Sequence, residues 1–586
     1  MADFKFIEEL GLSITFNLIA LQRTTQRYSM LLYQHEGILK AEDKKIGNAL
    51  SVSLQLNDFC VKAKEKNVDL ALTPEYSCPW QIINNIVSDS QKWPNIGKLW
   101  VIGCESITKE EIIKFKSDFN KNDSIVFYDE SVHGSNKNFL DPLVYLFQVQ
   151  KDSINKLFIL IQFKTRHMGV WGRGDIERDN IIQGNEIYIL RNTPQSIHFM
   201  SLICSDALNF SSDLDQAKKD RIEWDDKPYL IFNPQLNPDP SHPDFIAFRK
   251  FVFLSNDKEV ISLNWQLNSK IGTAKMLRYE WSRSGLYLKS SEINYSDLPR
   301  IVSNHEKGLY YFNNKKNKHS FLLNSSPHGF LIENLPVKIS NAQPVQIRRD
   351  GPKMIEAMMW KNQSNSLIKM NPVSDDHIDY LTSTGCQNKF LLDSSKCILE
   401  KERLVCLSIG KVTSNFGTTW SNIDNVDSIA MDENTEINGR ITVAQDSSVS
   451  SIDIKTKFID SVNELKTILD SKISFPDNIS DLKNEDIILS YYTDSHSDKY
   501  RYNVTSTNGD KKNVTIAYLN SPPLWLIGQT YTNLRNLFDN DNKNKERVVL
   551  FYKMGDVIKA EYDKSAASIT GTNDYDDNSI LKENDE

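Results

Sequence analysis

Short apolar runs alternate with helix-like stretches through the first half of the chain. Short runs rich in β-branched and aromatic residues predict buried strands, whereas apolar residues three or four positions apart predict helices. Strands are predicted at residues 14–21, 68–73, 99–103, 143–150, 157–163, 197–204, 229–232 and 260–265, and a helix is predicted at 46–64. This alternation indicates a layered α/β domain whose strands are buried on both faces.

The pattern changes in the second half. Runs at 308–312, 320–323 and 328–332 predict antiparallel strands that complete the sheet, and 346–375 is polar and mixed, with a helix expected near 353–360. Further strands are predicted at 404–409, 487–492, 514–519 and 548–552, and a helix at 456–469. We therefore expect a first domain over residues 1–340, a linker over 341–375, a separate α+β domain over 376–565 and an acidic, disordered tail over 566–586.

Composition narrows the class of protein. The chain has 586 residues, of which 40% are hydrophobic, which suffices for packed cores in more than one domain. The net charge of −8 argues against a nucleic-acid partner, because such binding needs a surplus of lysine and arginine. No apolar run is long enough for a membrane span, and the first residues do not have the pattern of a signal peptide. Seven irregularly spaced cysteines indicate reduced thiols in a cytoplasmic protein, and no metal or organic cofactor is expected.

Three of the predicted strands lead into reactive side chains. Glu75 follows one, Lys164 follows another, and Cys204 closes a third. Alone, each has an ordinary interpretation as a turn residue, a surface charge or a core thiol. Because sites in α/β sheets form where strands end, we expect the three side chains to meet. The carboxylate can accept the thiol proton, and the ammonium can lower the pKa of the thiol and stabilise an oxyanion.

The order of these segments resembles that of the nitrilase superfamily of carbon–nitrogen hydrolases. The family has a strand ending in Pro-Glu, here Pro74-Glu75, then a Lys-x-His-like segment, here Lys164 with His167. A strand ending in Cys-Tyr-Asp or similar follows, here Cys204-Ser205-Asp206. The resemblance covers residues 10 to about 335.

Two further features belong to the same resemblance. Many members carry a second glutamate shortly before a glycine that opens the next strand, and Glu177 occupies that place before Gly184, with Asp175 as a competing candidate. Asn264 and Trp265 end a strand where the family often places an asparagine near the pocket.

The resemblance implies a fold, a chemistry and an assembly. The fold is a four-layer α-β-β-α sandwich, and the protein is expected to form homo-oligomers. Cys204 is the nucleophile that attacks an amide, nitrile or carbamoyl carbon, and Glu75 is the base. Lys164 and the backbone N–H of Ser205 stabilise the oxyanion, and Glu177 holds Lys164 and the attacking water. The residues implied to contact a small amide or nitrile substrate are His167, Ser205, Asp206, Asn264 and Trp265.

Some features depart from the family and leave alternatives open. A polar insertion at 109–137 is expected to form extra surface structure or a lid, and Ser205 stands where an aromatic residue is usual. In a second hypothesis, the first domain is a sensor or effector in a multi-component bacterial system, such as phage defence, and the C-terminal domain binds a protein partner. A third is an acyl-transferring amidase. The Glu75, Lys164 and Cys204 set favours the hydrolase.

Overall fold

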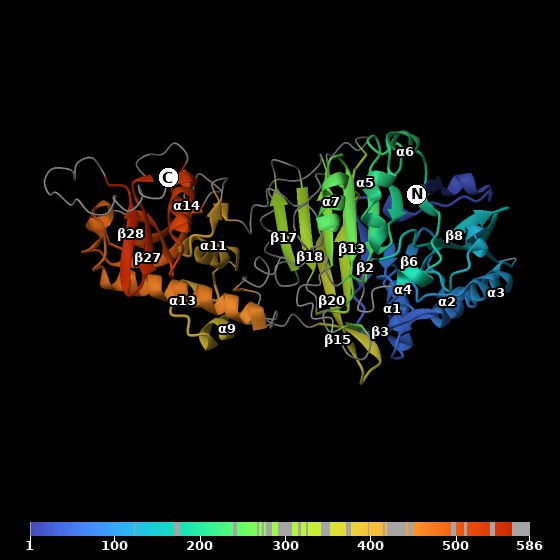
Figure 1. The fold of residues 1–586 in the computed structure, drawn as a ribbon, viewed down its shortest axis with the longest axis horizontal. Helices are drawn as coiled ribbons and strands as arrows, with labels where there is room; N and C mark the ends of the chain where they lie inside the picture. The colour runs from blue at the N-terminus through green and yellow to red at the C-terminus, as the bar shows by residue number, and fades with distance from the viewer. Residues whose placement is uncertain are drawn as a thin grey trace. The chain divides into compact units, whose positions relative to one another are not determined.

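The computed structural model forms two compact units, each with its own hydrophobic core (Figure 1). Among the described residues, the first unit extends to residue 370 and the second begins at residue 377. The structure describes residues 2–121, 123–168, 176–237, 243–266, 269–271, 275–276, 284–290, 308–313, 318–323, 326–340, 352–370, 377–396, 398–413, 417–418, 441–442, 449–493, 500–508, 512–538 and 545–564.

The first unit contains a nine-stranded sheet with the order β21-β20-β19-β2-β5-β6-β8-β9-β7. Its strands are β2 (Tyr28–Tyr33), β5 (Leu70–Leu72), β6 (Leu99–Gly103), β7 (Ser124–Tyr128), β8 (Pro142–Lys151), β9 (Ile154–Phe163), β19 (Gly329–Asn334), β20 (Lys353–Lys361) and β21 (Ser366–Lys369). Strands β2, β5 and β6 are parallel, so their carboxyl ends lie at one edge of the sheet.

A second, eight-stranded sheet has the order β1-β10-β11-β12-β13-β16-β18-β17. Its strands are β1 (Asp3–Phe6), β10 (Glu186–Leu190), β11 (His198–Ser201), β12 (Tyr229–Pro234), β13 (Lys258–Leu263), β16 (Gly285–Lys289), β17 (Gly308–Asn313) and β18 (Lys318–Leu323). Strands β11, β12 and β13 are parallel.

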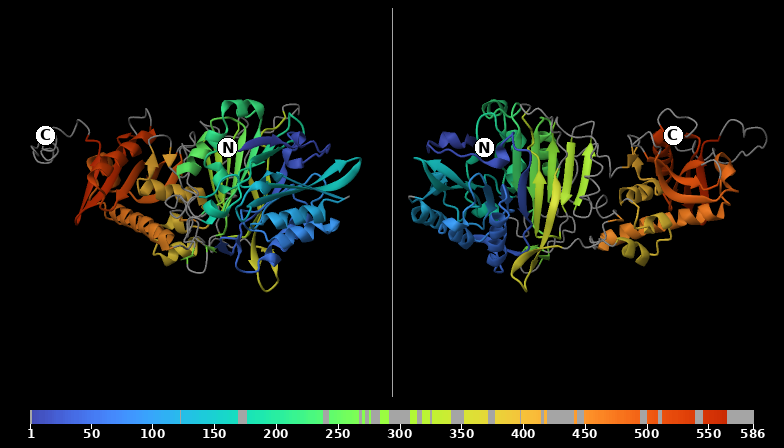
Figure 2. Two further views of the ribbon diagram at one scale, coloured as in Figure 1. Left: turned by 45° about the vertical axis from the view of Figure 1, so that its right-hand side comes forward. Right: turned by 180° about the vertical axis from the view of Figure 1, so that it is seen from behind.

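The two sheets pack face to face, with helices on their outer faces (Figure 2). Leu72 and Phe147 of the larger sheet share one buried cluster with Leu190 and Phe232 of the smaller. Helices α1 (Ser53–Glu65), α2 (Trp80–Val87) and α3 (Lys109–Phe119) pack on the other face of the nine-stranded sheet. Helices α5 (Phe210–Asp213) and α7 (Pro243–Val252) flank the eight-stranded sheet, where the Phe210 ring centroid lies 5.9 Å from that of Phe4. The layers run α-β-β-α.

Shorter elements complete the first unit. Strands β3 (Ile38–Glu42), β4 (Lys45–Asn48), β14 (Lys270–Ile271) and β15 (Lys275–Met276) form a small sheet. Helices α4 (Ile176–Asn180) and α6 (Gln216–Arg221) and the 3-10 helices η1 (Ile7–Leu10), η2 (Ile19–Leu21), η3 (Ser90–Lys92), η4 (Glu130–Gly134) and η5 (Cys204–Ala207) lie in the connections.

The second unit is built on a five-stranded sheet of β24 (Ile487–Thr493), β25 (Tyr500–Ser506), β26 (Asn513–Leu519), β27 (Val548–Met554) and β28 (Val557–Tyr562), in that order. Helices α11 (Ile398–Ser408), α13 (Val449–Ser471) and α14 (Leu524–Arg535) pack against it. The remaining elements are α9 (His377–Ser383), α10 (Lys389–Leu392), β22 (Val412–Thr413), β23 (Gly417–Thr418), η8 (Asp477–Leu482) and η9 (Asn536–Phe538).

The expected mixture of helices and sheets is confirmed, but three expectations about single segments are wrong. Residues 14–21 form one isolated bridge at Thr15 and the helix η2, not a strand. The helix expected at 353–360 is strand β20, so the expected linker at 341–375 contains two strands of the large sheet. The insertion at 109–137, for which extra surface structure or a lid was expected, supplies α3 and the edge strand β7, which agrees with the first alternative. The strand expected at 404–409 lies in helix α11.

The predicted acidic tail, 566–586, lies outside the described residues. Within the described part of the chain, no helix combines the length and apolarity that a membrane crossing requires.

Candidate active site

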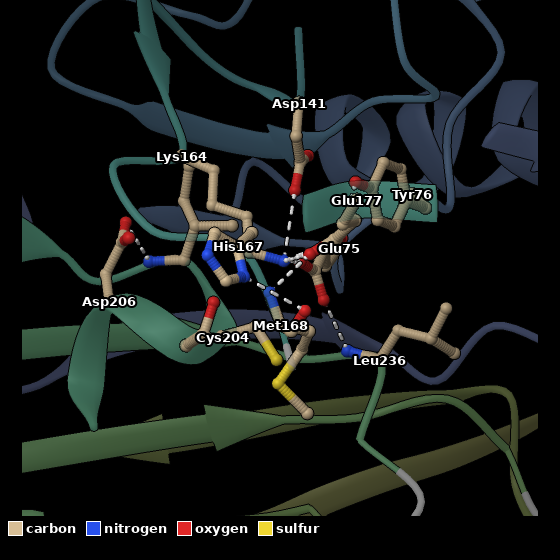
Figure 3. A network of polar contacts seen from close by, with 12 residues as sticks. Glu75, Tyr76, Asp141, Lys164, His167, Met168, Glu177, Cys204, Asp206 and Leu236 are labelled. Carbon is tan, nitrogen blue, oxygen red and sulfur yellow. Dashed lines mark hydrogen bonds and ion pairs between the residues drawn. The ribbon is translucent and has the colours of Figure 1, made fainter. Parts of the chain in front are cut away.

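The three reactive side chains predicted from the sequence each follow a strand, two in the nine-stranded sheet and one in the eight-stranded sheet. Glu75 comes three residues after β5 and Lys164 comes directly after β9, both in the nine-stranded sheet. Cys204 comes three residues after β11 of the eight-stranded sheet and begins η5. Because the sheets pack face to face, these ends converge on one buried cluster (Figure 3).

Two glycines allow the backbone to approach closely here. A Cβ on Gly103 would lie 2.1 Å from the carbonyl oxygen of Pro74, and one on Gly184 would lie 2.6 Å from that of Phe163. Neither distance is tolerated by a real side chain, so glycine is required beside the turn that carries Glu75 and beside the end of β9. Gly184 also donates its N–H to the carbonyl oxygen of Lys164 at 2.8 Å.

Lys164 is the cation at the centre of the cluster. Its Nζ donates to Glu75 Oε1 at 2.6 Å and to the two carboxylate oxygens of Glu177 at 2.9 and 3.0 Å. The Asp141 Oδ2 atom lies 3.7 Å from the same nitrogen. Burial lowers the pKa of Lys164, but the charges of Glu177 and Glu75 outweigh it, so that the pKa lies well above its ordinary value.

Glu75 is held at both its carboxylate and its backbone. Its Oε2 accepts the backbone N–H of Leu236 at 2.8 Å, and its carbonyl oxygen accepts the indole N–H of Trp265 at 2.7 Å. Burial raises the pKa of Glu75, and the neighbouring Lys164 opposes this rise only in part. A carboxylate of raised pKa that is fixed in position suits the transfer of a proton.

Glu177, the second glutamate, lies in α4 and connects Lys164 to its surroundings. The hydroxyl of Tyr76 donates to Glu177 Oε1 at 2.8 Å, and the backbone N–H of Met168 donates to Oε2 at 2.6 Å. These contacts leave Glu177 engaged on both oxygens. The competing candidate, Asp175, lies outside the described residues.

The Cys204 thiol is fully buried on the side of the cluster nearest Leu236 and Met168 (Figure 3). Burial raises the pKa of this thiol, Glu75 raises it further, and the opposing effect of Lys164 is smaller, so the pKa lies well above the usual range. Lys164 thus lowers the thiol pKa in the expected direction, but burial and Glu75 outweigh it. The φ of 41° at Cys204 places this residue in the left-handed region.

The side chains of Asp206 and Ser205 brace the neighbouring segments. Asp206 Oδ1 accepts the backbone N–H groups of Thr165 and Arg166 and the Thr165 hydroxyl, each at 2.9 Å, and Oδ2 accepts the backbone N–H of Ile203 at 3.2 Å. Burial raises the pKa of Asp206 to about 7, against the effect of these bonds. The Ser205 hydroxyl donates to the carbonyl oxygen of Arg166 at 2.6 Å.

Of the other predicted contacts, Trp265 reaches the cluster through its bond to Glu75. Asn264 joins the ends of β12 and β13, because its side chain both accepts from and donates to the backbone of Asn237 at 3.0 and 2.8 Å. His167 is half-buried, and its Nδ1 lies 3.3 Å from the carbonyl oxygen of Met168.

Sequence reasoning missed Asp141, which lies directly before β8 and is buried beside Glu75. An Asp-Pro pair before a strand usually marks a turn, so nothing in the local sequence indicated a site. Ligand oxygens of Glu75, Asp141 and Glu177 lie within 4.8 Å of one another, a spacing that could hold a metal ion. Lys164 Nζ lies among these carboxyls, so the cation of the cluster is an ammonium (Figure 3).

Comparison with known proteins gave structural matches only. No family model matches the sequence, and no curated protein matches it. An amidase from Nesterenkonia sp. matches with a TM-score of 0.24 and 13% identity, covering 42% of this chain and 80% of that chain. A cysteine-to-alanine mutant of the Nesterenkonia AN1 amidase from the nitrilase superfamily matches with a TM-score of 0.23, 12% identity and the same coverage. A third match is a mutant of that amidase showing Michael addition of acrylamide at the active site cysteine (TM-score 0.22, 13% identity, covering 41% and 80%).

Proposed function

We propose that the chain is a cysteine-dependent hydrolase of non-peptide carbon–nitrogen bonds, with Cys204 as nucleophile, Glu75 as base and Lys164 as cation. The observation that carries this proposal is the convergence of a thiol, a carboxylate and an ammonium in one buried cluster, where Lys164 donates to Glu75 at 2.6 Å and the charges of both groups act on the Cys204 thiol. A structural core has no need for this combination, because burying several ionisable groups is costly.

The first half-reaction forms a thioester-type intermediate. The Cys204 sulfur bonds to the amide, nitrile or carbamoyl carbon while the thiol proton passes to Glu75. For an amide, the carbonyl electron pair moves to oxygen, and the C–N bond then breaks as Glu75 returns the proton to the departing nitrogen. Because the pKa of the thiol is raised, a base in direct contact is needed, and Glu75 is that base.

Lys164 stabilises the charge that develops on the substrate. An ammonium has three N–H donors, and Lys164 directs them to Glu75 and to the two oxygens of Glu177. On substrate binding, one of the bonds to Glu177 is exchanged for a bond to the oxyanion, which the backbone N–H of Ser205 also binds. In the second half-reaction, water loses a proton to Glu75 and attacks the thioester carbon, and the thiol leaves with that proton.

Alkylation of the full-length protein tests the nucleophile. We expect iodoacetamide to label Cys204 before the other thiols, and Cys204→Ala to abolish both this labelling and ammonia release from a panel of small amides, nitriles and carbamoyl compounds. Cys60→Ala, which removes a buried thiol of α1, is the matched control and should retain both. Labelling that is undiminished in Cys204→Ala would sink the assignment.

A further inference from the structure

Asp141 presents a buried carboxyl to Glu75 that the reaction outlined above does not use. Its side chain is 1% exposed, and its backbone carbonyl accepts the N–H of Lys164 at 2.9 Å. The ionisable groups that face it come from three segments: Glu75 and Tyr76 after β5, Lys164 after β9, and Glu177 in α4. Asp141 is thus fixed inside the cluster and close to the proposed base.

The closeness of Asp141 and Glu75 favours a proton on one of the two groups. Carboxyl oxygens of the two residues lie within 4.8 Å of one another and both side chains are buried, so two ionised forms would repel each other and protonation of one is favoured. Glu75 already accepts an N–H bond on each oxygen, from Lys164 at 2.6 Å and from Leu236 at 2.8 Å. Asp141 Oδ2 has no hydrogen-bond partner among the described residues. The N–H groups that donate to Glu75 therefore stabilise its ionised form, so the proton is expected on Asp141.

The charge balance of the cluster points the same way. Lys164 is the one ammonium beside the carboxyls of Glu75, Asp141 and Glu177, and these side chains are 0%, 1% and 4% exposed. Three carboxylates around one cation would leave two uncompensated negative charges in a region that water does not reach, which is costly. A neutral Asp141 removes one of these charges.

We propose that Asp141 is a positioning residue that stays protonated and donates its hydrogen bond to Glu75, which keeps Glu75 ionised and aimed at Cys204. This inference rests on the proposed function of the same site. Asp141 lies on the side of the Lys164 ammonium opposite Cys204, so it acts through Glu75 and not on the substrate (Figure 3). Burial and the charge of Glu75 raise the pKa of Asp141 well above its usual range, and the same hydrogen bond lowers the pKa of Glu75.

The pH dependence of Cys204 alkylation by iodoacetamide in the full-length protein tests this role. The acid limb of this profile is the range in which the alkylation rate rises with pH as Glu75 loses its proton. Asp141→Asn keeps a neutral donor to Glu75, so the midpoint of the acid limb should stay within about 0.3 pH unit of wild type. Asp141→Ala removes the donor, so the pKa of Glu75 rises and the acid limb moves to higher pH, by about one unit. Rescue by Asn but not by Ala is the expected signature.

The other outcomes overturn the proposal. If Asp141 were ionised, both variants would remove a negative charge and the acid limb would move to lower pH. If Asp141 were only structural, neither profile would move. Infrared spectra of protein labelled with 13C-aspartate should also show a protonated carboxylic acid that disappears in Asp141→Asn, and absence of this band contradicts the proposal even where Asp141→Ala fails to fold. Loss of selective Cys204 labelling in wild type would instead mean that the proposed function has failed.

Discussion

At the scale of single residues, Lys164 is the cation that makes the buried carboxyls tolerable. Lys164→Met leaves Glu75 and Glu177 without a counter-charge, and removing one partner of a buried ion pair costs about 3–5 kcal/mol. The loss should shrink toward low pH, because protonation of Glu75 then removes the uncompensated charge. Urea unfolding at several pH values measures both effects.

Lys114→Met provides the control for this prediction. Lys114 lies on α3 with its side chain 75% exposed, in an ion pair with Asp118. Surface pairs of this kind contribute at most about 1 kcal/mol. A Lys164→Met protein as stable as the Lys114→Met protein would show that the central ammonium does not compensate the carboxyls.

Asp206 holds the segment after Lys164 against the segment that carries Cys204. Asp206→Asn keeps one acceptor oxygen but turns an amide N–H toward a backbone donor, so we expect a loss of about 1–3 kcal/mol in the free energy of unfolding. Slower alkylation of Cys204 should accompany it, since the two segments lose their connection. Asp226→Asn, on the surface, is the matched control, and equal stability of the two variants would contradict this role.

At the scale of elements, β20 and β21 extend the nine-stranded sheet beyond the region of the nitrilase-like resemblance. Met358 of β20 is 1% exposed, and Leu367 of β21 donates its backbone N–H to Asp58 of α1 at 2.6 Å. Met358→Ala should therefore destabilise the first unit by about 2–5 kcal/mol in urea unfolding. Ile355→Ala, at a position 37% exposed on the same strand, should cost less than about 1 kcal/mol. Similar losses in both variants would mean that β20 is not packed as described.

The errors of the sequence prediction at this scale have physical causes. In β20, the pairing register with β19 shifts between Leu331 and Ile332, so that Met354 and Ala357, three residues apart, both join the core between the sheets. The β-bulge therefore places two apolar residues three positions apart on one face of a strand, a spacing that is otherwise typical of a helix. In α11, every residue from Leu404 to Ser408 is buried, and a continuous apolar run does not distinguish a buried helix from a strand.

Strands β6, β8 and β9 were predicted to within a few residues because both of their faces are buried. Val101 and Tyr145 belong to the core between the sheets, whereas Trp100 and Val144 belong to the core beneath the helices. Continuous β-branched and aromatic runs of this kind are characteristic of central strands.

At the scale of the whole molecule, the two hydrophobic cores imply that the candidate site does not depend on the second unit. We propose that the domain boundary lies between residues 370 and 377, and that a chain ending at residue 374 retains selective alkylation of Cys204 at a rate close to that of wild type. A chain ending at residue 340 lacks β20 and β21 and should lose it, because β19 becomes an unpaired edge.

If Cys204 of the chain ending at residue 374 is not selectively alkylated, the site is not independent of the second unit, and the second unit has a part in it. The alternative function, a sensor or effector with a protein partner on the second unit, would gain support from a stable complex isolated with the full-length protein but not with the chain ending at residue 374.

The candidate site could be predicted in part, because Glu75, Lys164 and Cys204 follow strands whose ends converge. Asp141 could not, because its place in the site depends on the pairing register of two strands. Strands β8 and β9 form an antiparallel hairpin in which Pro142 pairs with Phe163, and this register sets Asp141 beside Lys164. The runs at 143–150 and 157–163 predict the two strands but not which of their residues pair.

The left-handed backbone of Cys204 has a thermodynamic consequence. At a φ of 41°, a side chain costs the folded protein about 1–3 kcal/mol, and glycine avoids this cost. Cys204→Gly should therefore unfold at a higher temperature than Cys204→Ala, although both lack the thiol. The same cost applies to the cysteine, so Cys204→Gly should also unfold at a higher temperature than wild type, and calorimetry of the three proteins would show that the most stable residue at this position is an unreactive one. Reactivity and stability are then in conflict at residue 204, and the conflict can be measured before any substrate is known.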